Sequence, residues 1–163
     1  MSNSEHLPTS VLVNTLDVDL IHVNIELTSA KKLLEKMAQV LTTALDEETK
    51  EKDIYHQLLE REKLGNTGIG NGIAIPHSRS EHAKTAVLAI ISLATPIDYD
   101  SSDRQAVDLA FGLLVPKDAA QEHLNLLADI ARMMSDPSKK EQLVDASSAE
   151  KVVSLISNWA ANT

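Results

Sequence analysis

The sequence predicts a single α/β domain in which helices cover both faces of a mixed β-sheet. Segments with strand and helix patterns follow one another as strand, two helices, three strands and three helices, and a two-faced sheet is the usual packing for such an order. Two of the predicted strands are long apolar runs without helical spacing, as in strands buried on both faces. No repeat or linker-like segment divides the 163 residues, a length that suits one domain with its own core.

Helix caps define the elements in the first part of the chain. Thr28 or Ser29 can cap one helix, because a hydroxyl there accepts a hydrogen bond from an otherwise free backbone N–H. Asp46 or Thr49 can cap the next helix, and Gly65 can end it. A segment with alternating apolar residues precedes both helices. The predicted elements are a strand at residues 20–27 and helices at residues 33–45 and 49–64.

Three strands and three helices are predicted in the rest of the chain. Pro76 ends the first strand, because proline has no N–H to donate to a neighbouring strand. The strands are residues 73–75, 85–94 and 106–115, and the helices are residues 120–135, 138–144 and 148–161. We expect the first of these helices to bury one stripe, formed by Leu124, Leu127, Ala131 and Met134.

Composition and charge exclude several classes of function. With no cysteine, the chain has no disulfides, no thiolate metal ligands and no cysteine nucleophile. The formal net charge is −9 and the basic residues are scattered, whereas nucleic-acid binding depends on clustered cations. One Trp, two Tyr and one Phe are too few for a base-stacking surface. We therefore expect protein partners and no nucleic acid.

The N-terminus and the apolar runs bear on location. The first ten residues lack the basic and apolar regions of a secretion signal. The apolar runs are too short to span a bilayer. We therefore expect a cytoplasmic protein without membrane insertion, in which residues 1–10 form an N-terminal arm and residues 11–160 form the domain.

One segment contains most of the chain's glycines. Four of the five lie in residues 61–79, REKLGNTGIGNGIAIPHSR. The segment does not fit a nucleotide P-loop, because Asn71 stands where that motif needs lysine, nor a GxGxxG fingerprint, which lies between a strand and a helix. Glycine-rich turns can instead present successive N–H groups to an anion. The residues we expect near a phosphate are Thr67, Gly68, Gly70, Asn71 and Ser78.

His77 follows this loop, and a histidine there suits phosphoryl transfer. A neutral imidazole can attack phosphorus with one nitrogen while the other holds the proton. Arg61 shares a helix face with apolar residues and can point toward the same place. His123 lies in the first turn of a later helix, where the helix N-terminus attracts anions. Taken one by one, an exposed turn histidine, a last-turn arginine and a surface histidine remain open alternatives for these residues.

Residues 61–77, REKLGNTGIGNGIAIPH, resemble the signature of the IIA components of the bacterial phosphotransferase system. The resemblance is to the fructose/mannitol superfamily, in particular its nitrogen-regulatory branch, and it extends from about Val11 to Trp159. It implies the phosphotransferase (PTS) IIA fructose/mannitol-like fold and phosphorylation of His77 through Nε2, beside Arg61 and His123. Family members often have glycine and lysine after the Pro-His pair, where this chain has serine and arginine.

The resemblance implies a phosphocarrier without metal or cofactor. His77 would accept a phosphoryl group from an HPr-like phosphohistidine protein, and its phosphorylation state would regulate target proteins such as kinases or potassium-transport components. The alternative within the superfamily is a sugar-specific EIIA that passes phosphate to a IIB domain. Two alternatives come from other classes. One is a binding module of the same fold that transfers no phosphate, and the other is a metal-dependent hydrolase.

Overall fold

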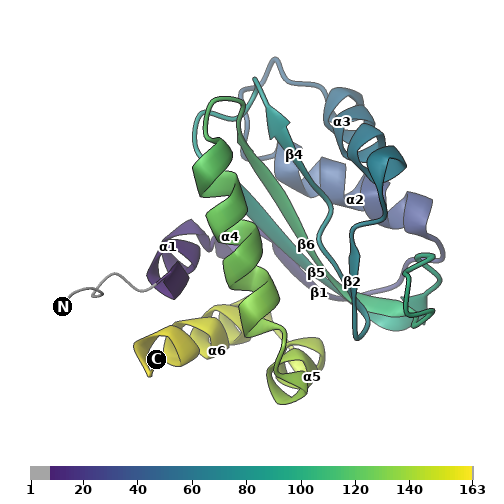
Figure 1. The fold of residues 1–163 in the computed structure, drawn as a ribbon, viewed down its shortest axis with the longest axis vertical. Coiled ribbons are helices and arrows are strands. Elements are labelled where there is room, and N and C mark those ends of the chain that lie inside the picture. Colours follow the sequence, from purple (N-terminus) through teal and green to yellow (C-terminus); the bar gives the residue numbers. More distant parts are fainter. Residues whose placement is uncertain (1–7, 163) are drawn as a thin grey trace.

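The fold is a six-stranded mixed sheet covered by helices on both faces, as the sequence predicts (Figure 1). The structure is a computed structural model that describes residues 8–162. The helices are α1 (Pro8–Thr15), the 3-10 helix η1 (Val18–Leu20), α2 (Ala30–Thr42), α3 (Glu51–Leu64), α4 (Ala120–Met133), α5 (Pro137–Asp145) and α6 (Ala149–Ala161). The strands are β1 (Ile21–Ile25), β2 (Gly68–Gly70), β3 (Ile73–Ala74), β4 (His77–Ser80), β5 (Val87–Ile97) and β6 (Val107–Pro116). Within the described residues, no helix is both long and apolar enough to cross a membrane.

The sheet is built around the antiparallel pair β5 and β6. Its order is β1-β5-β6-β3-β2, with β4 also paired to β6. β3 and β4 both run parallel to β6 and share one register, since Ile73 lies opposite Leu109 and His77 opposite Leu113. They therefore form one strand that is interrupted at Pro76, whose carbonyl still accepts the Leu113 N–H at 3.0 Å. This interruption places His77 at the start of β4.

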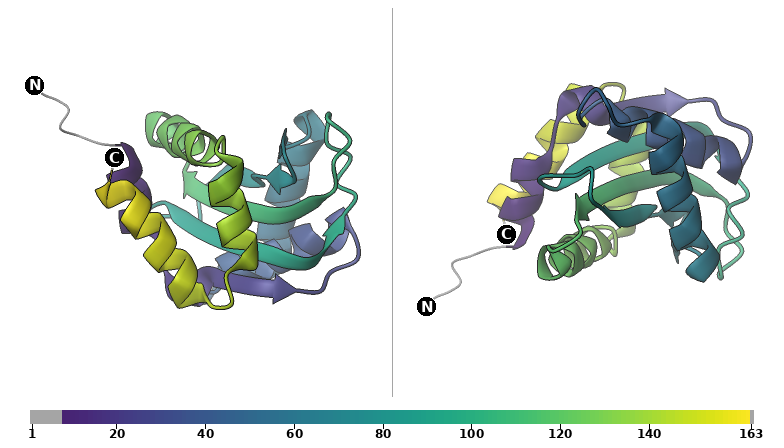
Figure 2. Two further views of the ribbon diagram at one scale, coloured as in Figure 1. Left: turned by 90° about the horizontal axis from the view of Figure 1, so that it is seen from below. Right: turned by 90° about the horizontal axis from the view of Figure 1, so that it is seen from above.

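Two hydrophobic cores lie on opposite faces of the sheet. One lies under α2 and α3, and the other under α1, α4, α5 and α6 (Figures 1 and 2). Side chains alternate along β6, so that Phe111 packs on the α4 side and Leu114 on the α2 side. Gly112 also lies on the α2 side, where a Cβ would stand 2.2 Å from the Met37 sulfur. The absence of a side chain at Gly112 therefore lets α2 pack closely on the sheet.

Four described elements have no counterpart among the predicted ones: α1, η1, β2 and β4. α1 begins at Pro8, so residues 8–10 of the expected arm belong to a helix, while residues 1–7 lie outside the described residues. β2 and β4 have only three and four residues, in sequences (GIG and HSRS) without a strand pattern. Their strand conformation comes from pairing with β3 and β6. Long-range pairing of this kind leaves no local signal in the sequence.

One predicted cap is confirmed and another is wrong. The Ser29 hydroxyl accepts the Lys32 N–H at 3.1 Å and caps α2. Neither Asp46 nor Thr49 caps α3, because the chain forms a turn first, with the Thr49 N–H donating to the Asp46 carbonyl at 2.9 Å. α3 starts one residue after Lys50, which makes no side-chain capping bond.

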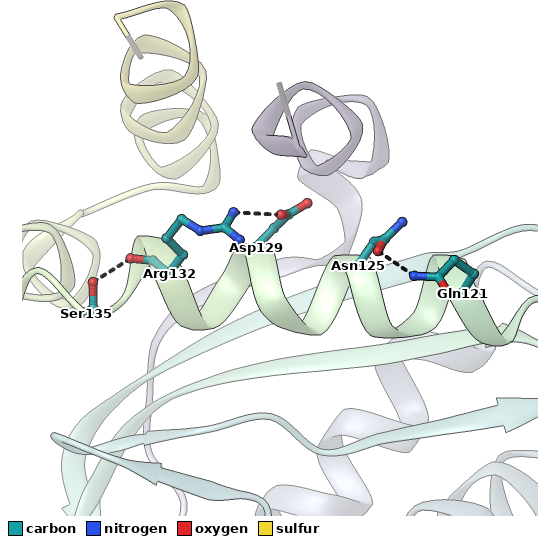
Figure 3. Close-up of polar contacts among 5 residues, drawn as sticks. All are labelled: Gln121, Asn125, Asp129, Arg132 and Ser135. Carbon is teal, nitrogen blue, oxygen red and sulfur yellow. Dashed lines mark hydrogen bonds and ion pairs between the residues drawn. The ribbon is translucent and has the colours of Figure 1, made fainter. Parts of the chain in front are cut away.

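The predicted buried stripe of α4 is also partly wrong. Leu124 is 60% exposed, whereas Leu126, Ile130 and Met133 are buried against the sheet. Figure 3 shows polar side chains on the side of α4 away from the strands. The contacts drawn are Gln121 Nε2 to Asn125 Oδ1 (3.0 Å), Arg132 Nη1 to Asp129 Oδ1 (3.1 Å) and, just beyond the end of the helix, Ser135 Oγ to the Arg132 carbonyl (2.7 Å). The helix is therefore rotated relative to the prediction, and Leu124 is left at the surface.

Candidate functional site

His77, Arg61 and His123 line one pocket. They come from three different elements: Arg61 from the last turn of α3, His77 from the start of β4 and His123 from the first turn of α4. Among the predicted loop residues, Ser78 belongs to the wall of this pocket and Thr67, Gly68, Gly70 and Asn71 do not. The structure therefore brings together the three residues that the sequence singled out individually.

Both ring nitrogens of His77 have a partner. Nδ1 lies 2.6 Å from the Ile75 carbonyl oxygen, and Arg61 Nε donates to Nε2 at 3.2 Å. An arginine N–H can only donate, so Nε2 is the acceptor nitrogen and the ring proton resides on Nδ1, which donates to Ile75. A second Arg61 nitrogen, Nη1, donates to the Gly65 carbonyl at 2.7 Å and holds the guanidinium in place. The arrangement fixes the tautomer in which Nε2 carries a lone pair.

The surroundings of His77 favour its neutral form. The residue is 8% exposed, and burial is the main cause that lowers the pKa of its imidazole. The Arg61 charge lowers that pKa further, while the Ile75 carbonyl and the Glu62 carboxylate oppose the shift. The net direction is downward, so Nε2 remains unprotonated at neutral pH.

His123 lies beside His77 as a second neutral imidazole. The two ring centroids are 5.0 Å apart and the ring planes meet at 85°. Burial lowers the pKa of His123 to about 4, with further contributions from the nearby His77, Arg79 and Arg61. In the unphosphorylated pocket, His123 is therefore an uncharged neighbour rather than a cation.

Three of the loop residues predicted to lie near a phosphate have N–H partners within the protein. The N–H groups of Thr67, Gly68 and Asn71 donate to Glu62 Oε1 (2.9 Å), Asn66 Oδ1 (2.8 Å) and Asp103 Oδ2 (3.0 Å). These N–H groups therefore point to side chains of the protein in this structure. Glycine is needed at Gly68 for another reason, since a Cβ there would lie 2.2 Å from Ser101 Oγ. Gly68 therefore serves close packing against the loop between β5 and β6.

Two exposed leucines were not recognised from the sequence as part of this site. Leu64 is 86% exposed and Leu124 is 60% exposed, and both line the pocket. Large apolar side chains grouped on a surface often mark a protein-binding site. The available signal was their position, with Leu64 three residues after the signature arginine and Leu124 directly after His123. The polar and charged wall residues outside the predicted set are His56, Gln57, Glu60, Arg79 and Lys117.

No metal-binding cluster is found among residues 8–162. No three or more of their histidine and acidic side chains are arranged to hold a metal ion.

The fold and the signature place the chain in a known class of phosphotransferase components. The family described as "Phosphoenolpyruvate-dependent sugar phosphotransferase system, EIIA 2" matches residues 14–159, and the chain belongs to this family. The resemblance seen in the sequence is thereby confirmed. Membership supports a phosphocarrier role within a phosphotransferase system.

Within this family, the chain is similar to nitrogen regulatory proteins. It is 40% identical over 134 residues to the nitrogen regulatory protein of Pseudomonas aeruginosa, covering 82% of this chain and 86% of that protein. It is 35% identical over 159 residues to the nitrogen regulatory protein of Escherichia coli, covering 97% and 95%. The structure is similar to the crystal structure of nitrogen regulatory protein IIA-Ntr from Neisseria meningitidis, with a TM-score of 0.84, 36% identity and coverage of 90% and 99%.

Proposed function

We propose that the protein is a phosphocarrier of the nitrogen-related phosphotransferase system that accepts a phosphoryl group on His77 Nε2 from an HPr-like phosphohistidine protein. The observation that carries this proposal is the pair of contacts at the His77 ring. Nδ1 is held by the Ile75 carbonyl, and Nε2 faces the Arg61 guanidinium with its lone pair. A nucleophile and the cation that would stabilise the transferred group are thus already adjacent.

The proposed step needs no proton from solvent. The lone pair of His77 Nε2 forms a bond to phosphorus while the phosphorus–nitrogen bond of the donor phosphohistidine breaks. The electron pair of the broken bond stays on the donor imidazole, which becomes neutral. The proton stays on His77 Nδ1, which continues to donate to the Ile75 carbonyl. This hydrogen bond stabilises the positive charge that the ring gains.

Arg61 and His123 would stabilise the transferred group. Once Nε2 is bonded to phosphorus it no longer accepts, and the Arg61 Nε–H is released to donate to a phosphoryl oxygen. His123 would take up a proton beside the phosphoryl group and contribute a second cation. Ser78 is also in the pocket wall, and its hydroxyl, which donates to the Arg79 carbonyl at 3.0 Å in this structure, would be a further donor if it turned toward the phosphoryl group.

The rim of the pocket suits a protein donor. The exposed Leu64 and Leu124 would contact apolar side chains of the donor, and Arg79 and Lys117 would attract its phosphoryl group. The protein would act in the cytoplasm, and its phosphorylation state would regulate target proteins such as kinases or potassium-transport components. The nitrogen regulatory proteins among its relatives support this role over sugar transport.

Phosphotransfer with purified components tests the proposal. The protein is incubated with phosphoenolpyruvate, enzyme I and either HPr or its nitrogen-branch paralogue, and an acid-labile adduct is measured. We expect a faster reaction with the nitrogen-branch donor and no adduct in His77→Ala. An adduct that persists in His77→Ala contradicts the assignment.

Two further assays separate the alternatives. Efficient onward transfer to a fructose- or mannitol-type IIB domain would favour the sugar-specific EIIA. Equal binding of target proteins to the unmodified chain, His77→Asp and His77→Ala would favour a binding module without phosphate transfer.

A further inference from the structure

A hydrogen-bonded network lies directly behind the candidate site. The Glu62 carboxylate accepts the Thr67 N–H on Oε1 (2.9 Å) and both the Thr67 hydroxyl and the Tyr99 hydroxyl (2.9 Å for Tyr99) on Oε2. Thr67 and Tyr99 are 4% and 3% exposed, so these bonds are shielded from water. A carboxylate that accepts three hydrogen bonds is in its acceptor-only, ionised form. The network joins α3 to Thr67, just before β2, and to Tyr99, in the loop after β5.

This network reaches both nitrogens of His77. Glu62 follows Arg61 in the last turn of α3, so the bonds of Glu62 fix the turn from which Arg61 reaches Nε2. On the other side, the Thr67 carbonyl accepts the Ile75 N–H at 3.0 Å, and the Ile75 carbonyl holds Nδ1. Thr67 therefore connects Glu62 to the backbone that sets the tautomer.

None of the three residues reaches the reacting atoms. Glu62, Thr67 and Tyr99 are absent from the pocket wall, which contains Arg61 and His77 themselves. Because bound phosphate would be out of their reach, their effect on transfer has to pass through the groups that they hold. Tyr99 is fixed further by its own carbonyl, which accepts Asn66 Nδ2 at 2.8 Å.

We propose that Glu62, together with Thr67 and Tyr99, positions the phosphoryl acceptor: the three residues hold Arg61 and the Ile75 carbonyl against the two nitrogens of His77. Thr67 is thereby assigned to the support of the site and not to the binding of phosphate. The inference rests on the proposed function and identifies the residues that hold the His77 ring in the tautomer with a lone pair on Nε2.

Because Glu62 is charged, its role should be measurable in the pKa of His77, which packing alone would not change in the same way. The charged or polar groups that act on His77 are Arg61, Glu62, His123 and the Ile75 carbonyl. Glu62 is the carboxylate among them, and it raises the pKa of His77 against the opposing effects of burial and Arg61. Removing the charge while keeping the shape of the side chain should therefore lower the pKa of His77.

The test compares the full chain with Glu62→Gln and Tyr99→Phe. Glu48→Gln, in the exposed turn before α3, is the matched control for loss of one negative charge. Using the phosphorylated HPr-like donor, we expect kcat to fall about 10-fold in Glu62→Gln and a few-fold in Tyr99→Phe, with the KM for the donor unchanged. The control should behave as the unmodified protein does.

NMR titration of the unphosphorylated proteins supplies a readout independent of transfer. The His77 pKa should be lower in Glu62→Gln than in the unmodified chain, and unchanged in Glu48→Gln. A folded Glu62→Gln with unchanged kcat and unchanged His77 titration overturns the inference, as does an increase in KM alone, which would assign Glu62 to donor docking.

Two remaining outcomes are also decisive. If Glu62→Gln does not fold, Tyr99→Phe decides the matter, and an unchanged kcat in that variant overturns the inference. If the unmodified protein accepts no phosphate from either donor, the proposed function fails, whereas the titration still shows whether the network sets the state of His77.

Discussion

The imidazole of His123 meets that of His77 edge to face, with ring centroids 5.0 Å apart and ring planes at 85°. Two imidazolium ions at this distance would repel each other, and burial keeps both rings neutral instead. A phosphoryl group on His77 would place a negative charge beside the neutral His123 ring. Several measurable consequences follow from the pair and its surroundings.

Phosphorylation of His77 should raise the pKa of His123. In the unphosphorylated protein that pKa lies at about 4, and an adjacent phosphoryl dianion favours the protonated ring. NMR titration of the His123 ring before and after phosphorylation measures the change. The ring signals of His22, in β1 and outside the pocket, serve as the internal reference. An identical His123 pKa before and after phosphorylation would show that the phosphoryl group does not act on this ring.

Replacing Arg61 by lysine should slow phosphotransfer by about 10- to 100-fold. Lysine keeps the charge but lacks the second nitrogen with which arginine contacts His77 and the Gly65 carbonyl at the same time. Single-turnover transfer from the phosphorylated donor measures the effect. Arg104→Lys, in the exposed loop between β5 and β6, is the control and should leave the rate unchanged. Equal rates for the two variants would mean that the paired contacts do not matter.

The free energy of unfolding should decrease as the pH falls below about 6.5. The fold lowers the pKa of His77 and of His123, so the unfolded chain binds more protons than the folded chain in this range. The loss should continue toward pH 4, where His123 titrates in the folded state. Urea unfolding at a series of pH values measures it, and His123→Gln should show a shallower pH dependence. Identical slopes would contradict the lowered pKa of His123.

Gly112→Ala should destabilise the protein by about 1–3 kcal/mol. The added Cβ would stand 2.2 Å from Met37 Sδ, inside the core between α2 and the sheet. Gly65→Ala is the control, because the nearest atom to its Cβ would be Arg61 Nη1 at 4.0 Å. Urea denaturation of the two variants should separate them clearly. Similar midpoints would show that Met37 moves aside at little cost.

Lys140→Ala should destabilise the protein by about 1–3 kcal/mol, since removing one member of a mostly buried ion pair leaves the other charge uncompensated. Lys140 Nζ lies 2.6 Å from Asp108 Oδ1, with both side chains less than one-fifth exposed. Apart from Lys140, that oxygen has no polar partner among the described residues. Lys84→Ala removes the exposed pair with Asp46 and should change stability by less than about 0.5 kcal/mol. Equal effects in thermal or urea unfolding would contradict the role of burial.

The predictable parts of the fold are those with strong local patterns. β5 and β6 are continuous apolar runs because both of their faces are buried, and this property is visible in the sequence. The short β2 and β4 take their conformation from their neighbours and leave no such pattern. Leu124 shows a further limit, because an apolar residue at helical spacing can equally line a binding surface.

The site was predictable as a set of residues but not as a geometry. The signature led to His77, Arg61 and His123, which the structure places in one pocket. The resemblance implied Nε2, but the contact of Nδ1 with the Ile75 carbonyl and the interruption of the strand at Pro76, which leave Nε2 with its lone pair, are not visible in the sequence. The same holds for Tyr99, which is 37 residues from Glu62 in the sequence and joins it across the fold.

The pocket also unites the two cores. Arg61 comes from a helix that packs on one face of the sheet, His123 comes from a helix that packs on the opposite face, and His77 lies in the strand between them. Loosening either layer would separate Arg61 or His123 from His77 before the rest of the molecule unfolded. If His77 accepts phosphate as proposed, a local disturbance of either helical layer should abolish that reaction well before the protein unfolds as a whole.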